Sequence, residues 1–340
     1  MKNFSCDCGQ RVYFENDFCL QCQRRLAYHP LHNRIYSLEN FDPATGQGVT
    51  SSAQSIRLCK NDIDYGVCNW LVTEPGYSYC ISCSLNQTIP NLLVPDRRDW
   101  WANMEQAKRK LLYTLLRLQL PVVNKSMDPD GGLAFEFIED RSSNPDVENE
   151  FVLTGHMNGL VTVNIAEADH VKREQVRQSL GESYRTLLGH FRHESGHYYF
   201  WKLVSSDRSR AEFRELFGDE TRDYQHAMDS YYSNRDGILR DTRMISHYAQ
   251  SHPLEDWAEC WAHYLHMIDT LETAAAFSVD KPNQQHDIHS IDDMLTRWGD
   301  LTILLNALNR SMGMADAYPF ILSDLTLRKI RFVHSLVNPS

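Results

Sequence analysis

The sequence lacks any long apolar run. A membrane-spanning helix needs about 18 consecutive apolar residues, and no such stretch occurs. The segment from Met1 to Cys8 also lacks the apolar core of a secretion signal. We therefore expect a cytoplasmic protein without a membrane partner.

Basic residues are fewer than acidic ones. The 340 residues carry 34 Lys and Arg against 45 Asp and Glu, which gives a formal net charge of −11. Within residues 1–90 the two signs are nearly balanced. This balance argues against the basic surface that phosphate backbones require, so we expect no nucleic-acid partner. The length and the 42% hydrophobic content indicate a main domain with a buried core and a smaller module.

Cysteine is almost absent beyond residue 83, where Cys260 stands alone. The other eight cysteines form two sets by proximity in the sequence: Cys6, Cys8, Cys19 and Cys22, then Cys59, Cys68, Cys80 and Cys83. Each set ends in a Cys-x-x-Cys pair, whose short turn lets two sulfurs bind one ion. Without a secretion signal, such sets favour thiolate metal sites over disulfides.

Four thiolates around one ion form a closed shell, which suits structural zinc and leaves no open position for chemistry. The segments around the cysteines are too short to form a large core, so the metal would supply much of the folding free energy. The cysteines could also interleave between the two sets, and iron in a rubredoxin-like site is an alternative. We expect residues 1–90 to form a zinc-ribbon module, either structural or binding a protein partner.

The rest of the chain is mixed in character. Apolar spacing predicts a helix over 98–120, and strand-like runs occupy 133–138, 150–153 and 159–165. We expect a small, mostly antiparallel sheet, with 159–165 as an edge strand above a cleft, where an extended peptide could add to it. From Val171 onward the pattern is helical almost throughout.

One motif in this helical part carries chemistry. His193, Glu194 and His197 form an HExxH sequence. On a helix, histidines four residues apart share one face, so both imidazoles can reach one metal ion, while the glutamate can contact a water on that ion. The alternative is that these are ordinary surface or core residues. The flanking apolar residues predict a buried helix, in which charged groups need partners or a metal.

A catalytic zinc needs a third protein ligand. The metzincin pattern would place a glycine and a histidine where Phe200 and Leu203 stand, which excludes that class. Downstream, Pro253 marks the start of a helix on which Glu255 and Glu259 lie four residues apart. We predict that Glu255 is the ligand and that Glu259 orients a ligand imidazole. The alternative for Glu259 is an exposed helical charge.

A tyrosine lies in the segment before this helix. The phenol of Tyr248 could approach the metal from the side opposite the glutamate of the motif and donate to an oxyanion. His247 and His252 flank the same segment and are rival ligands or donors, although exposed loop residues are the simpler interpretation. His190 and His263 are interpreted as structural histidines.

At these residues the chain resembles the zinc-binding metallopeptidase family of bacteria, which pairs N-terminal zinc ribbons with a gluzincin-like HExxH domain. The stretches that carry the resemblance are 193–199, 216–220, 252–259, 262–266 and 269–273.

The spacing of Tyr248, Glu255 and Glu259 is also similar to that of the lethal-factor metallopeptidases. In that group, these positions serve as transition-state donor, zinc ligand and supporting acid, and the resemblance implies the same roles here. One departure is the gap of 57 residues between His197 and Glu255, which is much longer than that in thermolysin-like enzymes and implies inserted helices at about 208–217 and 221–232.

The sequence thus predicts an α+β protein, with the zinc-ribbon module at 1–90 and a zincin-like metallopeptidase domain at 91–340. We expect one catalytic and two structural zinc ions. Glu194 would act as general base and Tyr248 as oxyanion donor on a peptide or protein substrate. Two alternatives stay open: an inactive adaptor that binds proteins, and a zinc hydrolase that acts on a non-peptide bond.

Overall fold

The computed structural model describes residues 1–150, 152, 154–179, 186–234, 239, 241–279 and 290–339. These residues fall into two units, one comprising the described residues up to 179 together with 186–188, the other the described residues from Gly189 onward. The first unit contains the sheets and the second is helical. The mixed helix and sheet composition confirms the predicted α+β class.

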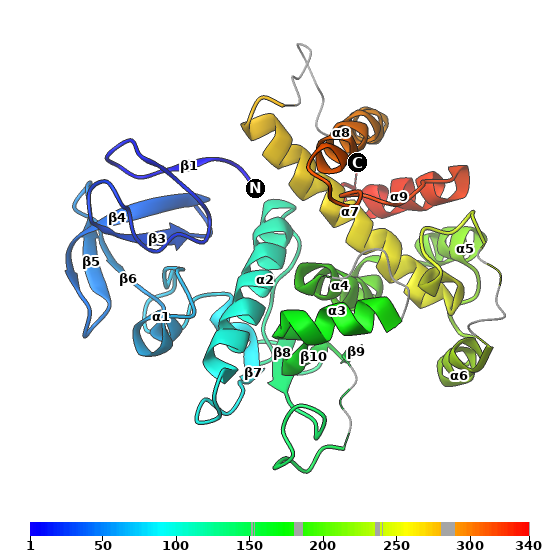
Figure 1. Ribbon diagram of the computed structural model, residues 1–340, viewed down its shortest axis with the longest axis horizontal. Coiled ribbons are helices and arrows are strands. Elements are labelled where there is room, and N and C mark those ends of the chain that lie inside the picture. The colour runs from blue at the N-terminus through cyan, green and yellow to red at the C-terminus, as the bar shows by residue number, and fades with distance from the viewer. Residues whose placement is uncertain are drawn as a thin grey trace. The chain divides into compact units, whose positions relative to one another are not determined.

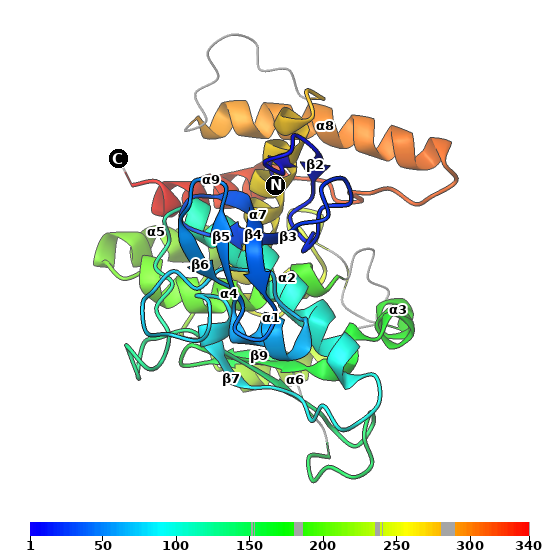
Figure 2. The same cartoon turned by 90° about the vertical axis from the view of Figure 1, so that its left-hand side faces the viewer.

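The N-terminal part of the first unit is an antiparallel sheet with the strand order β3-β4-β5-β6 (Figure 2). Its strands are β3 (Arg25–His29), β4 (Arg34–Asp42), β5 (Gln47–Thr50) and β6 (Ser55–Arg57), and a separate ribbon pairs β1 (Phe4–Ser5) with β2 (Arg11–Val12). The β4–β5 turn requires Gly46, which has φ +67° and lies so close to Ile63 that a Cβ would be 2.2 Å from its Cδ1. A small core of Ala27, Leu38 and Leu58 lies against this sheet.

A second sheet follows in the same unit, with the strand order β7-β8-β10-β9. Its strands are β7 (Asn86–Thr88), β8 (Ala134–Ile138), β9 (Gly155–Met157) and β10 (Leu160–Asn164). Both β7–β8 and β8–β10 are parallel, and β10–β9 is antiparallel. The expectation of a mostly antiparallel sheet was therefore wrong.

The predicted edge position of 159–165 was also wrong, because β10 lies between β8 and β9. The predicted alternation of buried and less buried residues is present in β10, where Val161 and Val163 are buried and their neighbours are less so. Alternation reports that one face of a strand is buried, and an interior strand can show it as well as an edge strand. The strand predicted at 150–153 includes residues 151 and 153, which lie outside the described residues.

The helices of the first unit are α1 (Lys60–Tyr65), α2 (Arg97–Arg117) and α3 (His170–Ser179), with short 3-10 segments η1 (Cys83–Leu85) and η2 (Ile165–Ala168). The prediction of a helix at 98–120 is confirmed by α2, which ends ahead of Pro121. Its buried face carries Trp101, Met104, Leu111 and Leu115, the apolar residues whose spacing predicted it.

The second unit is built around one long helix, α7, which Figure 1 shows in yellow. The elements are α4 (Leu187–Leu203), α5 (Asp207–Phe217), α6 (Tyr224–Asn234), η4 (Tyr248–Gln250), α7 (Pro253–Ala276), α8 (Ile291–Ser311) and α9 (Asp324–Val337). Helix α7 contacts α5, α8, α9 and η4. The inserted helices predicted between the motif and Glu255 are confirmed by α5 and α6.

Helices α4 and α7 approach each other closely. At Gly196 an added Cβ would lie 2.9 Å from the Cα of Ala258, so only glycine permits this separation. Trp257 donates its indole N–H to the Gly196 carbonyl at 2.8 Å, and Trp261 donates to the Ser195 hydroxyl at 3.0 Å. These contacts hold the faces of the two helices that carry the predicted ligands against each other. Across the described helices, none combines the length and the apolar character that crossing a bilayer demands.

Candidate metal centres

The structure gathers three groups of side chains whose ligand atoms lie within 4.8 Å of one another. The first cysteine group is Cys6, Cys8, Cys19 and Cys22, the second cysteine group is Cys59, Cys68, Cys80 and Cys83, and the histidine–glutamate centre is His193, His197 and Glu255. The cysteines divide between the groups as their order in the chain suggests, without interleaving. None of the nine cysteines forms a disulfide.

The first cysteine group lies at the surface of its unit. Cys6 and Cys19 are buried, whereas Cys8 and Cys22 are half-buried. The Sγ atoms of Cys6 and Cys22 are 3.5 Å apart, and those of Cys8 and Cys19 are 3.7 Å apart. Although burial raises the pKa of the Cys19 thiol, the backbone N–H groups of Cys22 and Gln21 outweigh it and lower the pKa to about 7. The Cys-x-x-Cys turn thus stabilises a thiolate, as a metal ligand requires.

The second cysteine group is fully buried. The Sγ atoms of Cys68 and Cys80 are 3.7 Å apart. Backbone N–H groups point at the sulfurs: those of Cys80, Cys83 and Trp70 donate to Cys59, Cys80 and Cys68, each at 3.4 Å. Four buried thiols surrounded by N–H donors form a closed site for a structural ion.

Helix α2 supplies charged groups around this second cysteine group. Glu105 accepts a weak hydrogen bond from the Cys83 thiol at 3.8 Å and pairs with the fully buried Lys108 at 2.9 Å. Arg109 is buried and donates to the Val67 carbonyl at 2.6 Å. Burial alone would lower the pKa of Arg109, but Cys68 and Glu105 raise it. The buried guanidinium of Arg109 therefore interacts with the sulfurs of the second cysteine group.

The histidine–glutamate centre joins α4 to α7. His193 Nε2 is 3.0 Å from Glu255 Oε2, and His197 Nε2 is 3.4 Å from Glu255 Oε1. Burial would raise the pKa of Glu255, but His197 and His193 outweigh it and hold the pKa well below its usual range. One atom from each of the three residues lies within 4.8 Å of the other two, as the ligands of a single ion must.

Glu259 lies one turn further along α7, where it contacts the same histidine. Its Oε1 is 2.9 Å from Nδ1 of His193. A hydrogen bond donated by Nδ1 leaves the lone pair of Nε2 directed toward Glu255 and toward any ion between them. Burial would raise the pKa of Glu259, but the hydrogen bond with His193 outweighs it and lowers the pKa.

Glu194 differs from the other acids of this region. Its side chain is 8% exposed, and its Oε2 accepts no hydrogen bond from any residue that the structure describes. Buried polar atoms are almost always hydrogen-bonded, so an unsatisfied carboxylate oxygen beside three ligands indicates a place for a further group. Burial raises the pKa of Glu194. Two imidazoles, one carboxylate and this neighbour fit a zinc ion with an open coordination position.

Tyr248 begins η4 and lies next to the centre. Its ring centroid is 5.8 Å from that of His193, and the ring of Tyr231 packs edge-on against it at 5.9 Å. Burial, followed by the negative charge of Glu255, raises the pKa of Tyr248 well above its ordinary value. The phenol is therefore protonated and can donate a hydrogen bond.

The structure also places one residue that the sequence analysis missed. Tyr224, the first residue of α6, donates its hydroxyl to Glu255 Oε1 at 2.7 Å. It belongs to an inserted helix and to no motif, so the sequence offers no signal for it.

His252 was wrongly interpreted as an exposed loop residue. It is buried, and as the N-cap of α7 it accepts the N–H of Leu254 at 3.1 Å and bonds the Arg222 carbonyl at 3.2 Å. His247 bonds the Tyr231 hydroxyl at 2.7 Å. His263 is buried against the Tyr318 hydroxyl at 2.9 Å, which confirms a structural role.

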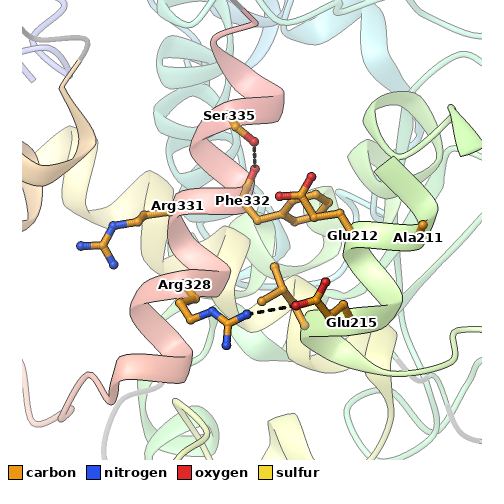
Figure 3. A pocket seen from close by; sticks show the side chains of 8 residues that line it. Ala211, Glu212, Glu215, Arg328, Arg331, Phe332 and Ser335 are labelled. Atoms are coloured by element: carbon orange, nitrogen blue, oxygen red, sulfur yellow. Dashed lines mark hydrogen bonds and ion pairs between the residues drawn. The ribbon is translucent and has the colours of Figure 1, made fainter. Parts of the chain in front are cut away.

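A hollow of about 550 Å³ lies elsewhere in the second unit, between α5 and α9. Figure 3 shows Arg328 turned toward Glu215, with 3.3 Å between them, while Arg331 points away. Arg331 pairs instead with Asp292 at 2.7 Å. Both arginines and Glu215 are engaged in ion pairs, and the lining includes no His or Cys, so this hollow does not resemble the three candidate metal centres.

Comparison with known proteins identifies the family. The family described as "Putative zinc-binding metallo-peptidase" matches residues 97–336, and a zinc-ribbon domain family matches residues 3–94. The chain therefore belongs to this zinc-binding metallopeptidase family, as the resemblance in its motifs predicted.

Two similar relatives are mycobacterial. The proteins Rv2568c of Mycobacterium tuberculosis and Mb2598c of Mycobacterium bovis, both named as uncharacterized proteins, are each 39% identical to the chain over 346 aligned positions. The match covers 99% of this chain and 96% of each relative. No solved structure gives a significant match.

Proposed function

We propose that this chain is a zinc-dependent peptidase of the gluzincin type, with His193, His197 and Glu255 as the ligands of the catalytic zinc. The observation that carries the proposal is the buried Glu194, whose Oε2 accepts no hydrogen bond from a described residue and whose charge interacts with those of the three ligands. A site built only to hold a structural ion has no use for a further carboxylate with an unsatisfied oxygen. An open site with a general base does.

Zinc bound here would polarise a peptide carbonyl and lower the pKa of a water molecule. The residues of the chain perform the remaining steps. Glu194 accepts a proton from the attacking water and delivers it to the nitrogen of the leaving amine. Its raised pKa makes it a stronger base than an exposed glutamate, which suits this transfer.

Two further residues assist in this mechanism. Tyr248 donates its phenolic hydrogen to the oxyanion that develops on the substrate carbonyl, and its raised pKa keeps that hydrogen in place. Glu259 holds the ring of His193 through Nδ1, so that Nε2 stays directed at the metal.

The two cysteine groups serve as structural zinc sites in this proposal, which gives three zinc ions per chain. The substrate is a peptide or protein, in keeping with the family. We place the boundary between the zinc-ribbon module and the peptidase domain near residue 90. A reducing compartment such as the cytoplasm suits eight grouped cysteines that form no disulfide.

Incubation with a peptide library, followed by mass spectrometry, tests the proposal. We expect new peptide ends in the presence of the zinc-loaded protein, none after treatment with a chelator, and recovery when zinc is restored. Metal analysis of the same preparation should count three zinc ions. Two ions, with both cysteine groups filled and no cleavage, would contradict the catalytic site and favour a protein-binding adaptor.

A further inference from the structure

Two phenols lie close to the histidine–glutamate centre, and they differ in what they touch. The Tyr224 hydroxyl contacts Glu255 Oε1 at 2.7 Å. The Tyr248 hydroxyl makes no hydrogen bond to a described residue, although its ring adjoins His193. One phenol is thus engaged with a proposed ligand while the other is available to a substrate.

The two oxygens of Glu255 have different partners. Oε2 faces His193 Nε2 at 3.0 Å, whereas Oε1 faces the Tyr224 hydroxyl at 2.7 Å and His197 Nε2 at 3.4 Å. A carboxylate can only accept, so the phenol is the donor, and hydrogen bonds of this charge-assisted kind are strong. The bond restricts rotation of the carboxylate and leaves Oε2 as the oxygen directed toward the His193 side of the centre.

Tyr224 is itself held in place by the start of α7. His252 packs its ring against that of Tyr224, with 5.2 Å between centroids. The same His252 caps α7 through the Leu254 N–H and bonds the carbonyl of Arg222, two residues before Tyr224. The entry to α6 is therefore tied to the turn of α7 that carries Glu255.

From these contacts we propose that Tyr224 is a positioning residue, which orients Glu255 as a metal ligand through a hydrogen bond to Oε1. The inference rests on the proposed zinc site and assigns a residue that no motif indicates. Partners of this kind typically contribute about 10- to 100-fold in metal affinity. Tyr224 thus raises the affinity for zinc, whereas Tyr248 acts in the reaction.

The test compares Tyr224→Phe with Tyr248→Phe and Tyr232→Phe. Tyr232 is on the same helix as Tyr224, is 57% exposed and makes no described bond to Glu255, so it serves as the matched control. The dissociation constant of zinc at the histidine–glutamate centre is measured by competition with a chromophoric chelator. The cysteine groups are kept loaded, and circular dichroism checks the fold of each variant.

We expect Tyr224→Phe to raise the zinc dissociation constant about 10- to 100-fold, with the other two variants unchanged. Excess zinc should then restore most of the peptide hydrolysis of Tyr224→Phe but none of that lost in Tyr248→Phe. A merely structural defect would not be rescued by zinc.

Two outcomes overturn the proposal in distinguishable ways. If Tyr224→Phe binds zinc as tightly as the wild type and loses turnover, Tyr224 is an oxyanion donor and not a positioning residue. If neither the zinc dissociation constant nor the turnover of Tyr224→Phe differs from the wild type, the hydrogen bond to Glu255 has no function. A wild-type protein that binds no zinc at this centre would instead remove the proposed function itself.

Discussion

The second cysteine group and the histidine–glutamate centre each bring metal-ligating atoms within 4.8 Å of one another, but the groups that surround them differ. Around the four thiols, backbone N–H groups and the buried Arg109 satisfy the charge and close the site. Around the histidine–glutamate centre, neither Glu194 Oε2 nor the Tyr248 hydroxyl has a hydrogen-bond partner among the described residues. Four thiols close the coordination shell of a structural ion, whereas two imidazoles and one carboxylate leave a position open beside an unsatisfied acid.

The largest expected effect concerns the closed site. Cys80→Ser should lose the ion of the second cysteine group, and the segments that pack on α2 should unfold. Structural zinc contributes a folding free energy on the order of 10 kcal/mol in small zinc domains. Zinc content and hydrogen exchange of α2 measure this. Cys260→Ser, which changes a buried thiol outside both groups, is the control and should keep all zinc. If the amides of α2 in Cys80→Ser were as well protected from hydrogen exchange as in the wild type, the second cysteine group would not be the structural site that this comparison assumes.

A smaller effect, confined to activity, is expected at the open site. Glu194→Gln should retain zinc and thermal stability but lower kcat by about 10²- to 10⁴-fold, because the general base is removed. Steady-state kinetics with metal analysis measure both quantities. Glu212→Gln removes the charge of an exposed acid on α5 and should leave kcat unchanged. Substantial turnover by Glu194→Gln would show that another group takes the proton.

Tyr248→Phe should lower kcat by about 10²-fold, which is the typical effect of losing one oxyanion donor. The zinc affinity should stay the same, because the hydroxyl makes no hydrogen bond to a described ligand. Kinetics at saturating zinc measure the loss. An unchanged kcat would show that Tyr248 takes no part in the mechanism. A hydroxyl without a partner among the described residues would then no longer distinguish the histidine–glutamate centre from the second cysteine group.

The smallest expected effect concerns the packing that holds the open site together. In Gly196→Ala the new Cβ would meet the Cα of Ala258 at 2.9 Å, and such overpacking costs about 1–3 kcal/mol. Gly299→Ala on α8 is the control, because its Cβ meets no atom within 4 Å. It should stabilise the helix by about 0.5–1 kcal/mol. Thermal unfolding of both variants should show shifts of opposite sign, and equal shifts would contradict close packing of α4 on α7.

Local patterns predicted much of the fold. The helix at 98–120 and those at 208–217 and 221–232 followed from apolar spacing and from the length of the inserted segment, and α2, α5 and α6 match them. The strand at 159–165 was also located, but its partners were not. Alternation reports only which face of a strand is buried, so it contains no information on parallel pairing or on position within a sheet.

The candidate centres divide in the same way. The sequence by itself determined that His193 and His197 share one helical face and that each Cys-x-x-Cys turn presents two sulfurs, because these relations depend only on local backbone geometry. Only the tertiary structure decided that the Tyr224 hydroxyl bonds Glu255 and that His252 is a buried cap. Contacts between distant segments depend on how helices pack, as the close approach at Gly196 shows, and no local spacing encodes them.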